Sequence, residues 1–572
     1  MKDDIYSKNA IYKFLRPSYN KLIISKGIIG GNLFPKKDIN IEKSKITFPD
    51  NLIKKESKKN ININYKMDYV KDSYEFSFDG LIPRINSISS GRYHNLVLLD
   101  NGKVLSWGHN EKGSLGQGTV TNSEISLPTK IKESNNKNYL GNNDTSGYDG
   151  TNAISVSCGH EHSAILLNTG KVITFGNNTY GQLGHGKSDD YSSGDPSGVK
   201  DSNLKDSNGV VDLSSYNGSN AVAVSCGGWH TLILLNNGKV ISFGWNSKGN
   251  LGQGNNLVSS QPDPSGILMN AGYDGTNAIA VSGGGYFSLV LLKSGKVISF
   301  GRNDKGDLGN GQIINTNYGI PQSVLEINGY DGTNVVQVEC GYDHGGILLK
   351  SGKVLMFGLN ESGQLGRGNL DNSGNPEEIL KVVGYNGINC VSIFCGSYHS
   401  LILLDNGKVI SFGWSDNKQL GHDVATANVS TPVEVKYGSS YNKNNCVLCS
   451  CTWSHTLLLL DNGKILSFGK NNESQLGLGN SNNGNFGTLQ SIISTTDYTG
   501  NNILTIGKNI INTNFNLDKK INFIFKNNFE NFTTNMQLNN YVRYFTFDNK
   551  NINITTSLPM LNSTFKAIEL IK

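Results

Sequence analysis

Six histidines recur at one position of a repeated sequence signature and are the first candidates for chemistry. A set of imidazole groups could ligate a metal ion or move protons in acid–base catalysis. The equivalent position of a seventh copy of the signature holds Phe287. The six are His94, His162, His230, His344, His399 and His455. Chemistry by this set would require the elements that carry the histidines to bring them to one point.

The eight cysteines suggest a metal site or disulfides, but most of them follow the same repeat. Five stand four residues before the shared histidine position, where the other two copies have Ser90 and Gly283. A place that accepts Cys, Ser or Gly selects a small side chain. The run Cys446-x2-Cys449-x-Cys451 has spacing like that of zinc ligands, with strand packing as the alternative that we favour. We expect reduced thiols and no metal.

Two other repeated positions are candidates for binding. A lysine follows a tight turn in every copy, and a ring of copies would set seven ammonium groups around one face, where solvated turn lysines are the plainer interpretation. They are Lys103, Lys171, Lys239, Lys296, Lys353, Lys408 and Lys464. A second position, between a Phe-Gly or Trp-Gly pair and a glycine-rich loop, varies between copies. There we select Trp245, Arg302 and Trp414 as contact residues, because Trp and Arg are frequent interface anchors.

No arrangement typical of catalysis stands out in the sequence. There is no evident nucleophile–base pair or carboxylate pair, and the glycine-rich loops lack the Lys-Ser/Thr of a phosphate-binding loop. We therefore expect neither an enzyme nor a cofactor, and assign no catalytic residue.

The elements that carry these residues are copies of one unit. The shared positions follow each other at steps of 68, 68, 57, 57, 55 and 56 residues. Each copy reads as a turn, an alternating strand, an apolar strand, a tight Gly-containing turn, a third strand, a glycine loop and a last strand, often with proline. Proline places that last strand at a sheet edge.

Seven units of four antiparallel strands predict an all-β, seven-bladed β-propeller. Its ring keeps equivalent positions apart, so we expect the histidines to be structural, each hydrogen-bonded within its own blade.

The ends of the chain differ from the repeats. We predict a basic N-terminal extension over residues 1–77, the propeller over 78–507, and an Asn- and aromatic-rich C-terminal extension over 508–572. The segment Asp497–Gly507 repeats only the turn and first strand. We predict that this partial copy, or the stretch before Phe78, closes the ring.

Charge and composition limit the partners. Lys and Arg outnumber Asp and Glu by 16 to 9 over residues 1–77 and by 8 to 4 over residues 500–572, whereas the rest has 27 against 33. Basic ends on an acidic body could bind a polyanion. No apolar run is long enough to span a bilayer and the N-terminus does not read as a signal peptide, so we expect an intracellular protein, with a virion as an alternative.

The signature GxxHxxxLxxxGxVxxFGxNxxGQLGxG resembles the repeat of the regulator of chromosome condensation family. Residues 158–186 and 340–368 carry it well, and the resemblance covers about residues 80–495. It implies a seven-bladed propeller, and members range from a nucleotide exchange factor for the small GTPase Ran to ubiquitin-ligase parts and a photoreceptor. Our leading hypothesis is a non-catalytic scaffold for protein–protein interaction. The alternatives are a guanine-nucleotide exchange factor for a Ran-like GTPase and a self-assembling structural protein, such as one of a large DNA virus.

Overall fold

The computed structural model of the chain describes residues 87–121, 123–134, 147–188, 192–200, 216–254, 259–422, 427–436, 440–443, 445–480 and 484–503, together with eight short strands outside this span. The chain forms two compact units, one of residues Pro83–Thr505 and one of Met1–Ile82 with Ile506–Lys572. The sequence-based limits at 78 and 507 differ from these by a few residues.

The unit formed by the two ends contains two antiparallel sheets. One has the order β1-β5-β34-β36-β35, and the other has the order β2-β3-β4. In the first, β5 from the N-terminal part pairs with β34 from the C-terminal part, so the two ends share a sheet. The strands are β1 (Lys21–Ile24), β2 (Asn40–Glu42), β3 (Lys45–Thr47), β4 (Asn62–Asn64), β5 (Tyr74–Phe78), β34 (Ile521–Ile524), β35 (Tyr544–Asp548) and β36 (Asn551–Thr555).

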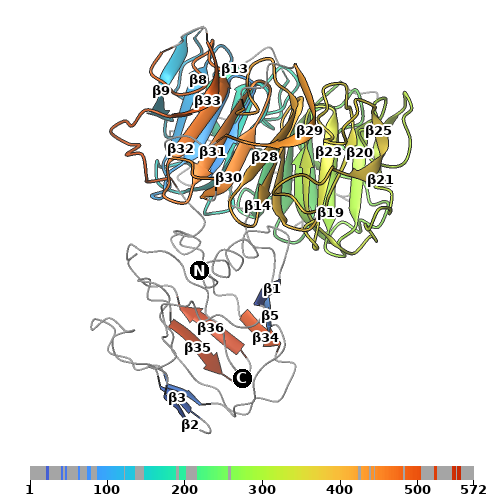
Figure 1. Cartoon of the computed structure of the whole chain (residues 1–572). Coiled ribbons are helices and arrows are strands. Elements are labelled where there is room, and N and C mark those ends of the chain that lie inside the picture. Colours follow the sequence, from blue (N-terminus) through green and yellow to red (C-terminus); the bar gives the residue numbers. More distant parts are fainter. Residues whose placement is uncertain are drawn as a thin grey trace, which may run out of the picture. The chain divides into compact units, whose positions relative to one another are not determined.

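The larger unit consists of seven four-stranded antiparallel sheets, and the described residues contain no helix. Neighbouring inner strands lie side by side around the ring, and the last lies beside the first. Figure 1 shows the sheets following one another in chain order, with β8 of the first blade near β31 and β32 of the last. The prediction of a seven-bladed propeller is confirmed.

Each blade runs outward from the axis in sequence order. The inner strands are β6 (Ile88–Ser90), β10 (Ala153–Cys158), β14 (Ala221–Cys226), β18 (Ala278–Gly283), β22 (Val335–Cys340), β26 (Cys390–Cys395) and β30 (Cys446–Cys451). The second strands are β7 (His94–Leu98), β11 (His162–Leu167), β15 (His230–Leu235), β19 (Phe287–Leu292), β23 (His344–Leu349), β27 (His399–Leu404) and β31 (His455–Leu460). The third strands are β8 (Val104–His109), β12 (Val172–Asn177), β16 (Val240–Trp245), β20 (Val297–Arg302), β24 (Val354–Gly358), β28 (Val409–Trp414) and β32 (Ile465–Lys470). The outer strands are β9 (Glu124–Lys130), β13 (Ser192–Gly198), β17 (Ser260–Gly266), β21 (Asn317–Ser323), β25 (Ser373–Glu378), β29 (Asn428–Glu434) and β33 (Asn485–Ser491).

The apolar second strands hold the ring together because both of their faces are buried. In β7, Leu96 and Leu98 belong to the core shared with the second blade, whereas Val97 and the residue after the strand, Leu99, belong to the core shared with the last blade. A strand buried on both faces reads as a continuous apolar run instead of an alternating one. This explains sequences such as HTLILL in β15.

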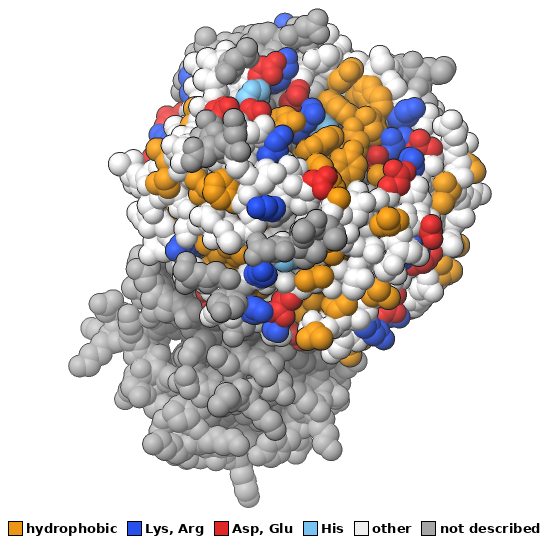
Figure 2. Space-filling view, turned by 45° about the horizontal axis from the view of Figure 1, so that its top comes forward, with side chains coloured by type: hydrophobic (Ala, Val, Ile, Leu, Met, Phe, Trp, Pro, Cys, Tyr) orange, Lys and Arg blue, Asp and Glu red, His pale blue; other side chains and the backbone are white. Residues whose placement is uncertain are grey.

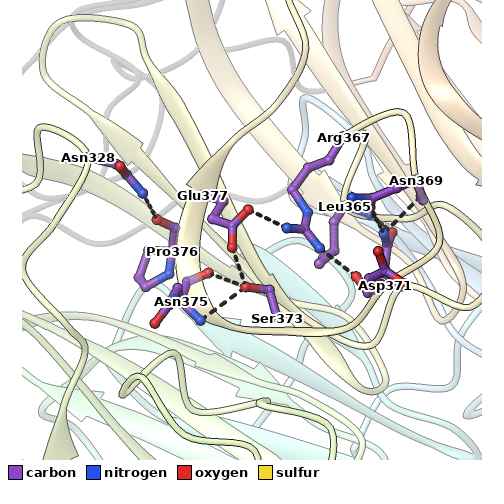
Figure 3. Close-up of polar contacts among 10 residues, drawn as sticks. Asn328, Leu365, Arg367, Asn369, Asp371, Ser373, Asn375, Pro376 and Glu377 are labelled. Carbon is purple, nitrogen blue, oxygen red and sulfur yellow. Dashed lines mark hydrogen bonds and ion pairs between the residues drawn. The ribbon is translucent and has the colours of Figure 1, made fainter.

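The outer strands form the sheet edges, as their prolines predict. Figure 3 shows how such an edge is fastened in β25, where the carbonyl of Pro376 accepts a 2.7 Å hydrogen bond from Asn328 in the turn that precedes the blade. In the same view, Arg367 of the glycine loop is ion-paired with Glu377, whose carboxylate accepts a 2.7 Å bond from Ser373. These contacts fix the glycine loop to the outer strand.

The partial copy at the end of the array closes the ring, as predicted. Ile503 bridges to Leu99, in the way that Ala153 pairs with Leu167 in the second blade. The hydroxyl of Tyr498 accepts a 3.0 Å bond from the amide of Ile465 in the last blade. The turns before the other blades use an equivalent tyrosine, so the partial copy supplies the last such contact.

Candidate functional site

The shared histidines link neighbouring blades, and our expectation that each bonds within its own blade was wrong. His94 Nε2 lies 2.8 Å from Ser163 Oγ of the second blade, and His162 Nε2 lies 3.0 Å from Thr231 Oγ1 of the third. The same link joins His230 to Ser288, His344 to Ser400, His399 to Thr456 and His455 to Asn95. The partner of each histidine is thus the residue that follows the equivalent position in the next copy.

The network around each link fixes the protonation of the imidazole. Ser163 Oγ donates a 2.9 Å bond to the carbonyl of Ser114 in the first blade, so it accepts a bond from His94 Nε2–H. Burial lowers the pKa of His94, His162 and His230 to about 3. The histidines are therefore neutral blade fasteners, and the ring holds them apart.

One seam of the ring is built differently. The fourth blade has Phe287 in place of the histidine, and the partner position in the fifth blade is Gly345, which has no side chain. Beside this seam, Arg302 forms ion pairs with Asp343 of the fifth blade, with Asp304 at 2.9 Å and with Asp307 at 3.4 Å. Burial raises the pKa of Asp307 well above its ordinary value. At this boundary between the fourth and fifth blades, which we call the charged seam, ion pairs take the place of the neutral histidine hydrogen bond.

The repeated lysines and the variable positions lie at opposite ends of the third strands. The lysines follow the turn between second and third strands, and most of them are engaged. Lys103 lies 2.8 Å from Asp497, Lys353 lies 3.1 Å from Glu378 and Lys408 lies 3.2 Å from Glu434. These carboxylates reduce the field of the lysine ring. Binding by the lysines stays a prediction.

At the other end, the backbone pairs every variable residue with the residue before the shared histidine position. The amide of Trp245 donates a 2.9 Å bond to the carbonyl of Trp229, and Trp414 donates a 2.8 Å bond to Tyr398. Gly244 makes this approach possible, because it has a φ of +110° and a Cβ there would lie 2.6 Å from the Trp229 oxygen. Each blade thus presents two adjacent side chains at this face.

Side chains at these two positions, together with those that stand two residues before the shared histidine position, form one aromatic cluster, which we call the aromatic face. It comprises His160, Trp229, Trp245, Tyr286, Tyr342, Tyr398, Trp414 and Trp453. His160 and Tyr342 belong to the second and fifth blades, yet their rings stack with centroids 5.1 Å apart and planes within 10°. All seven tryptophan and tyrosine side chains are half-buried, so each keeps an exposed part.

Further contacts connect the aromatic face to the charged seam. The centroids of Trp245 and Tyr286 are 5.1 Å apart, and the hydroxyl of Tyr342 donates a 2.7 Å bond to that of Tyr286. The guanidinium of Arg302 lies over the Tyr286 ring at 4.6 Å. Figure 2 shows a broad patch of hydrophobic side chains on the molecular surface with Lys, Arg, Asp and Glu side chains at its border.

The structure therefore brings two of the three chosen variable residues near each other, through Tyr286, and leaves the third nearby. Trp245 and Arg302 both contact Tyr286, and Trp414 contacts Tyr398 with a centroid distance of 6.0 Å. The sequence reasoning missed the two residues between Gly and His in each signature. They vary from copy to copy as the chosen position does, and this variation was the signal that could have identified them.

The cysteine run lies on β30, the inner strand of the last blade. The Sγ atoms of Cys446 and Cys449 are 3.7 Å apart in the buried part of the last blade. In the part of the chain that the structure describes, no group of three His, Cys, Asp or Glu side chains is placed to hold a metal ion.

The same described residues include no helix with the length and hydropathy of a membrane span.

Comparison with sequence families gives matches over most of the ring. The RCC1-like domain matches residues 198–511, and the regulator of chromosome condensation (RCC1) repeat matches residues 101–166. A second RCC1 repeat profile matches residues 85–114 and 153–182.

Among curated proteins, the ultraviolet-B receptor UVR8 of Arabidopsis thaliana is 27% identical over 417 residues, which cover 73% of this chain and 84% of the receptor. The probable E3 ubiquitin-protein ligase HERC6 of Homo sapiens is 30% identical over 328 residues, or 57% of this chain. The chain spans only 28% of the length of that ligase.

Solved structures share the fold. Human WBSCR16 superposes with a TM-score of 0.55 at 20% identity, covering 68% of this chain and 94% of the other. Yeast RCC1 (Prp20), solved bound to Kap60, superposes with a TM-score of 0.55 at 18% identity, covering 72% and 85%. At these identities the likeness shows the propeller architecture alone.

Proposed function

This chain belongs to the RCC1-like family of seven-bladed propellers, and we propose that it is a non-catalytic scaffold that binds a protein partner through its aromatic face. One observation carries the proposal: half-buried Trp and Tyr side chains from several blades meet at one end of the ring. The blade architecture does not require them, because the copies do not share them.

The chemistry of this face is that of an interface and not of a reaction centre. Aromatic side chains combine a large contact area with few rotatable bonds, and they are enriched among residues that dominate binding energy. The histidine at its centre, His160, is neutral, because burial lowers its pKa to about 3. The carboxyl groups of Asp304, Asp307 and Asp343 are engaged with Arg302.

A retention experiment tests this function. Full-length chain and its Trp245→Ala and Trp414→Ala variants would be immobilised, and the proteins retained from a cell extract would be compared by mass spectrometry. We expect both substitutions to release the same partner, and Lys239→Ala, on the opposite face, to retain it. Loss of the partner in Lys239→Ala but not in the tryptophan variants would contradict the proposal.

A second measurement distinguishes a nucleotide exchange factor from a scaffold without exchange activity. The chain would be mixed with Ran-like GTPases loaded with a fluorescent nucleotide, and release would be followed over time. Accelerated release would replace a plain scaffold by an exchange factor. Sedimentation of the free chain at high concentration would likewise reveal self-assembly as the function of the face.

A further inference from the structure

Acidic and basic side chains pair around the aromatic face. Arg92, Arg302 and Lys470 lie over aromatic rings of this end of the propeller. The carboxyl groups that pair with Arg92, Arg302 and His109 here number five. They are Glu161, Asp304, Asp307, Asp343 and Glu473. Glu161, Asp304 and Glu473 keep an exposed part, and such carboxylates accept hydrogen bonds from guanidinium groups of a partner.

The rings of the face already hold guanidinium groups of the chain itself. Arg92 lies 4.7 Å from the centroid of Trp453 and 4.9 Å from that of Tyr93. Arg302 combines its place over Tyr286 with the Asp304 and Asp343 carboxylates. Such sites stack the flat guanidinium on a ring and bind its N–H groups with carboxylate oxygens. Trp229, Trp245 and Trp414 are half-buried rings that keep an exposed part, and no Lys or Arg of the described residues lies over them.

The imidazole of His160 is a buried polar group inside this cluster that the described residues leave without a hydrogen bond. Its side chain contacts the rings of Trp229, Tyr342 and Trp453. Neither Nδ1 nor Nε2 has a hydrogen-bond partner in the described part of the chain, although His160 is only 9% exposed. Burying an imidazole in this way costs free energy, which a ligand that donates to its free nitrogen would recover.

From these contacts we infer that the aromatic face recognises a basic segment of a protein partner, with arginine side chains inserted among the rings. The inference rests on the proposed function and names the chemistry of its partner. Arginine suits the site better than lysine, because the guanidinium stacks on aromatic faces and pairs with carboxylates through two parallel bonds. A nucleic acid is disfavoured, since its phosphates would face the carboxylates.

The tryptophans provide a direct test with the full chain. Four of the five, Trp229, Trp245, Trp414 and Trp453, lie in the aromatic face, whereas Trp107 is fully buried in the core. Titration with a hexa-arginine amide peptide should change the tryptophan fluorescence saturably, at a concentration about tenfold lower than hexa-lysine amide requires. Hexa-glutamate and a thymidine oligonucleotide should produce no saturable change.

Two variants assign the binding to the carboxylates. Asp304 has a side chain that is 35% exposed, and Asp304→Asn should weaken hexa-arginine binding about fivefold. Glu361→Gln is the matched control, because Glu361 pairs with Lys305 at the outer part of the same end and is 63% exposed. It should leave binding unchanged, and both variants should unfold at the same urea concentration as the parent chain.

The outcomes separate this inference from the proposed function. Absence of hexa-arginine binding, or equal binding of hexa-glutamate or the oligonucleotide, overturns the recognition of a basic segment. The scaffold function still stands in that case if Trp245→Ala releases the retained partner. Hexa-arginine binding that Asp304→Asn leaves intact and Glu361→Gln weakens would place the interaction elsewhere and also overturn the inference.

Discussion

The imidazole Nε2 of His455, in the last blade, lies 2.7 Å from the side-chain Oδ1 of Asn95, in the first blade. Asn95 in turn donates a 2.8 Å bond to the carbonyl of Gln475, which lies in the glycine loop of the last blade. Asn95 stands where the next blades have Ser163 or Thr231 and makes the same two connections. The seam that joins the two ends of the array is therefore fastened like the internal seams.

This seam predicts a non-additive response to substitution. Asn95→Ala should lower the free energy of unfolding by about 1–3 kcal/mol, because it leaves the His455 imidazole buried without a partner and removes one of the two bonds that the Gln475 carbonyl accepts. Adding His455→Phe should recover part of the loss, since Phe287 opposite Gly345 shows that an apolar ring serves where no partner side chain exists. Urea unfolding of the parent, both single variants and the double variant gives the coupling. Strictly additive losses would mean that the two side chains are independent.

The buried histidines predict a loss of stability in mild acid. Burial lowers the pKa of His344, His399 and His455 from the ordinary histidine value of 6.5 to about 3 in the folded chain. Below pH 6.5 the unfolded chain binds protons that the folded chain does not. The contribution of the neutral histidines to the free energy of unfolding is therefore fully present above that pH. It is lost as the pH drops toward 3, by about 1.4 kcal/mol per pH unit for each histidine.

The measurement is urea unfolding at pH 7.5, 6.5 and 5.5. His344→Phe removes one titrating group, so its stability should depend on pH less steeply than that of the parent, by about one proton. An equal slope in parent and variant would show that His344 is not neutral in the folded chain.

The ring could be predicted from the sequence because its signals are local. Strand periodicity, the Gly-containing turn before each lysine and the edge prolines all act within one blade. The partial copy that begins at Asp497 could also be recognised from the sequence, because Tyr498 repeats the tyrosine of the other turns. Local signals repeated along the chain determine the number of blades.

The aromatic face could not be predicted in the same way. His160 and Tyr342 are separated by two blades in the sequence, and only closure of the ring brings their rings into contact. The direction of the histidine links was missed for a related reason. A histidine and its partner lie one copy apart, so the alignment shows both residues in every blade without showing that the bond crosses the seam.

Tyr498 allows a test of ring closure in the whole chain. Tyr498→Phe removes the hydroxyl that accepts a bond from the amide of Ile465 and leaves that buried amide unpaired. The free energy of unfolding should fall by about 1–3 kcal/mol. Tyr318→Phe is the control, because the Tyr318 hydroxyl bonds Gln312 at the exposed surface and its loss should cost little. Equal losses in the two variants would argue against a closing role for the partial copy.

The charged seam predicts a loss of stability whose pH dependence is opposite to that of the histidines. Arg302→Leu leaves Asp307 and Asp343 buried without their counter-charge, and it should cost about 3 kcal/mol at pH 7.5. Burial already raises the pKa of both carboxyl groups, and loss of the guanidinium raises it further. A raised pKa in the folded chain means that protons bind more readily there than in the unfolded chain.

The difference in stability between parent and Arg302→Leu should therefore shrink as the pH falls from 7.5 to 5, because protonation removes the uncompensated charge. Lys470→Leu is the matched control, since Lys470 occupies the equivalent place in the last blade beside half-buried Tyr93 and should change stability by less than about 0.5 kcal/mol at either pH. Urea unfolding of the three chains at both pH values decides the point. A loss in Arg302→Leu that is the same at pH 7.5 and pH 5 would show that the residue acts through packing over Tyr286 and not through the two aspartates.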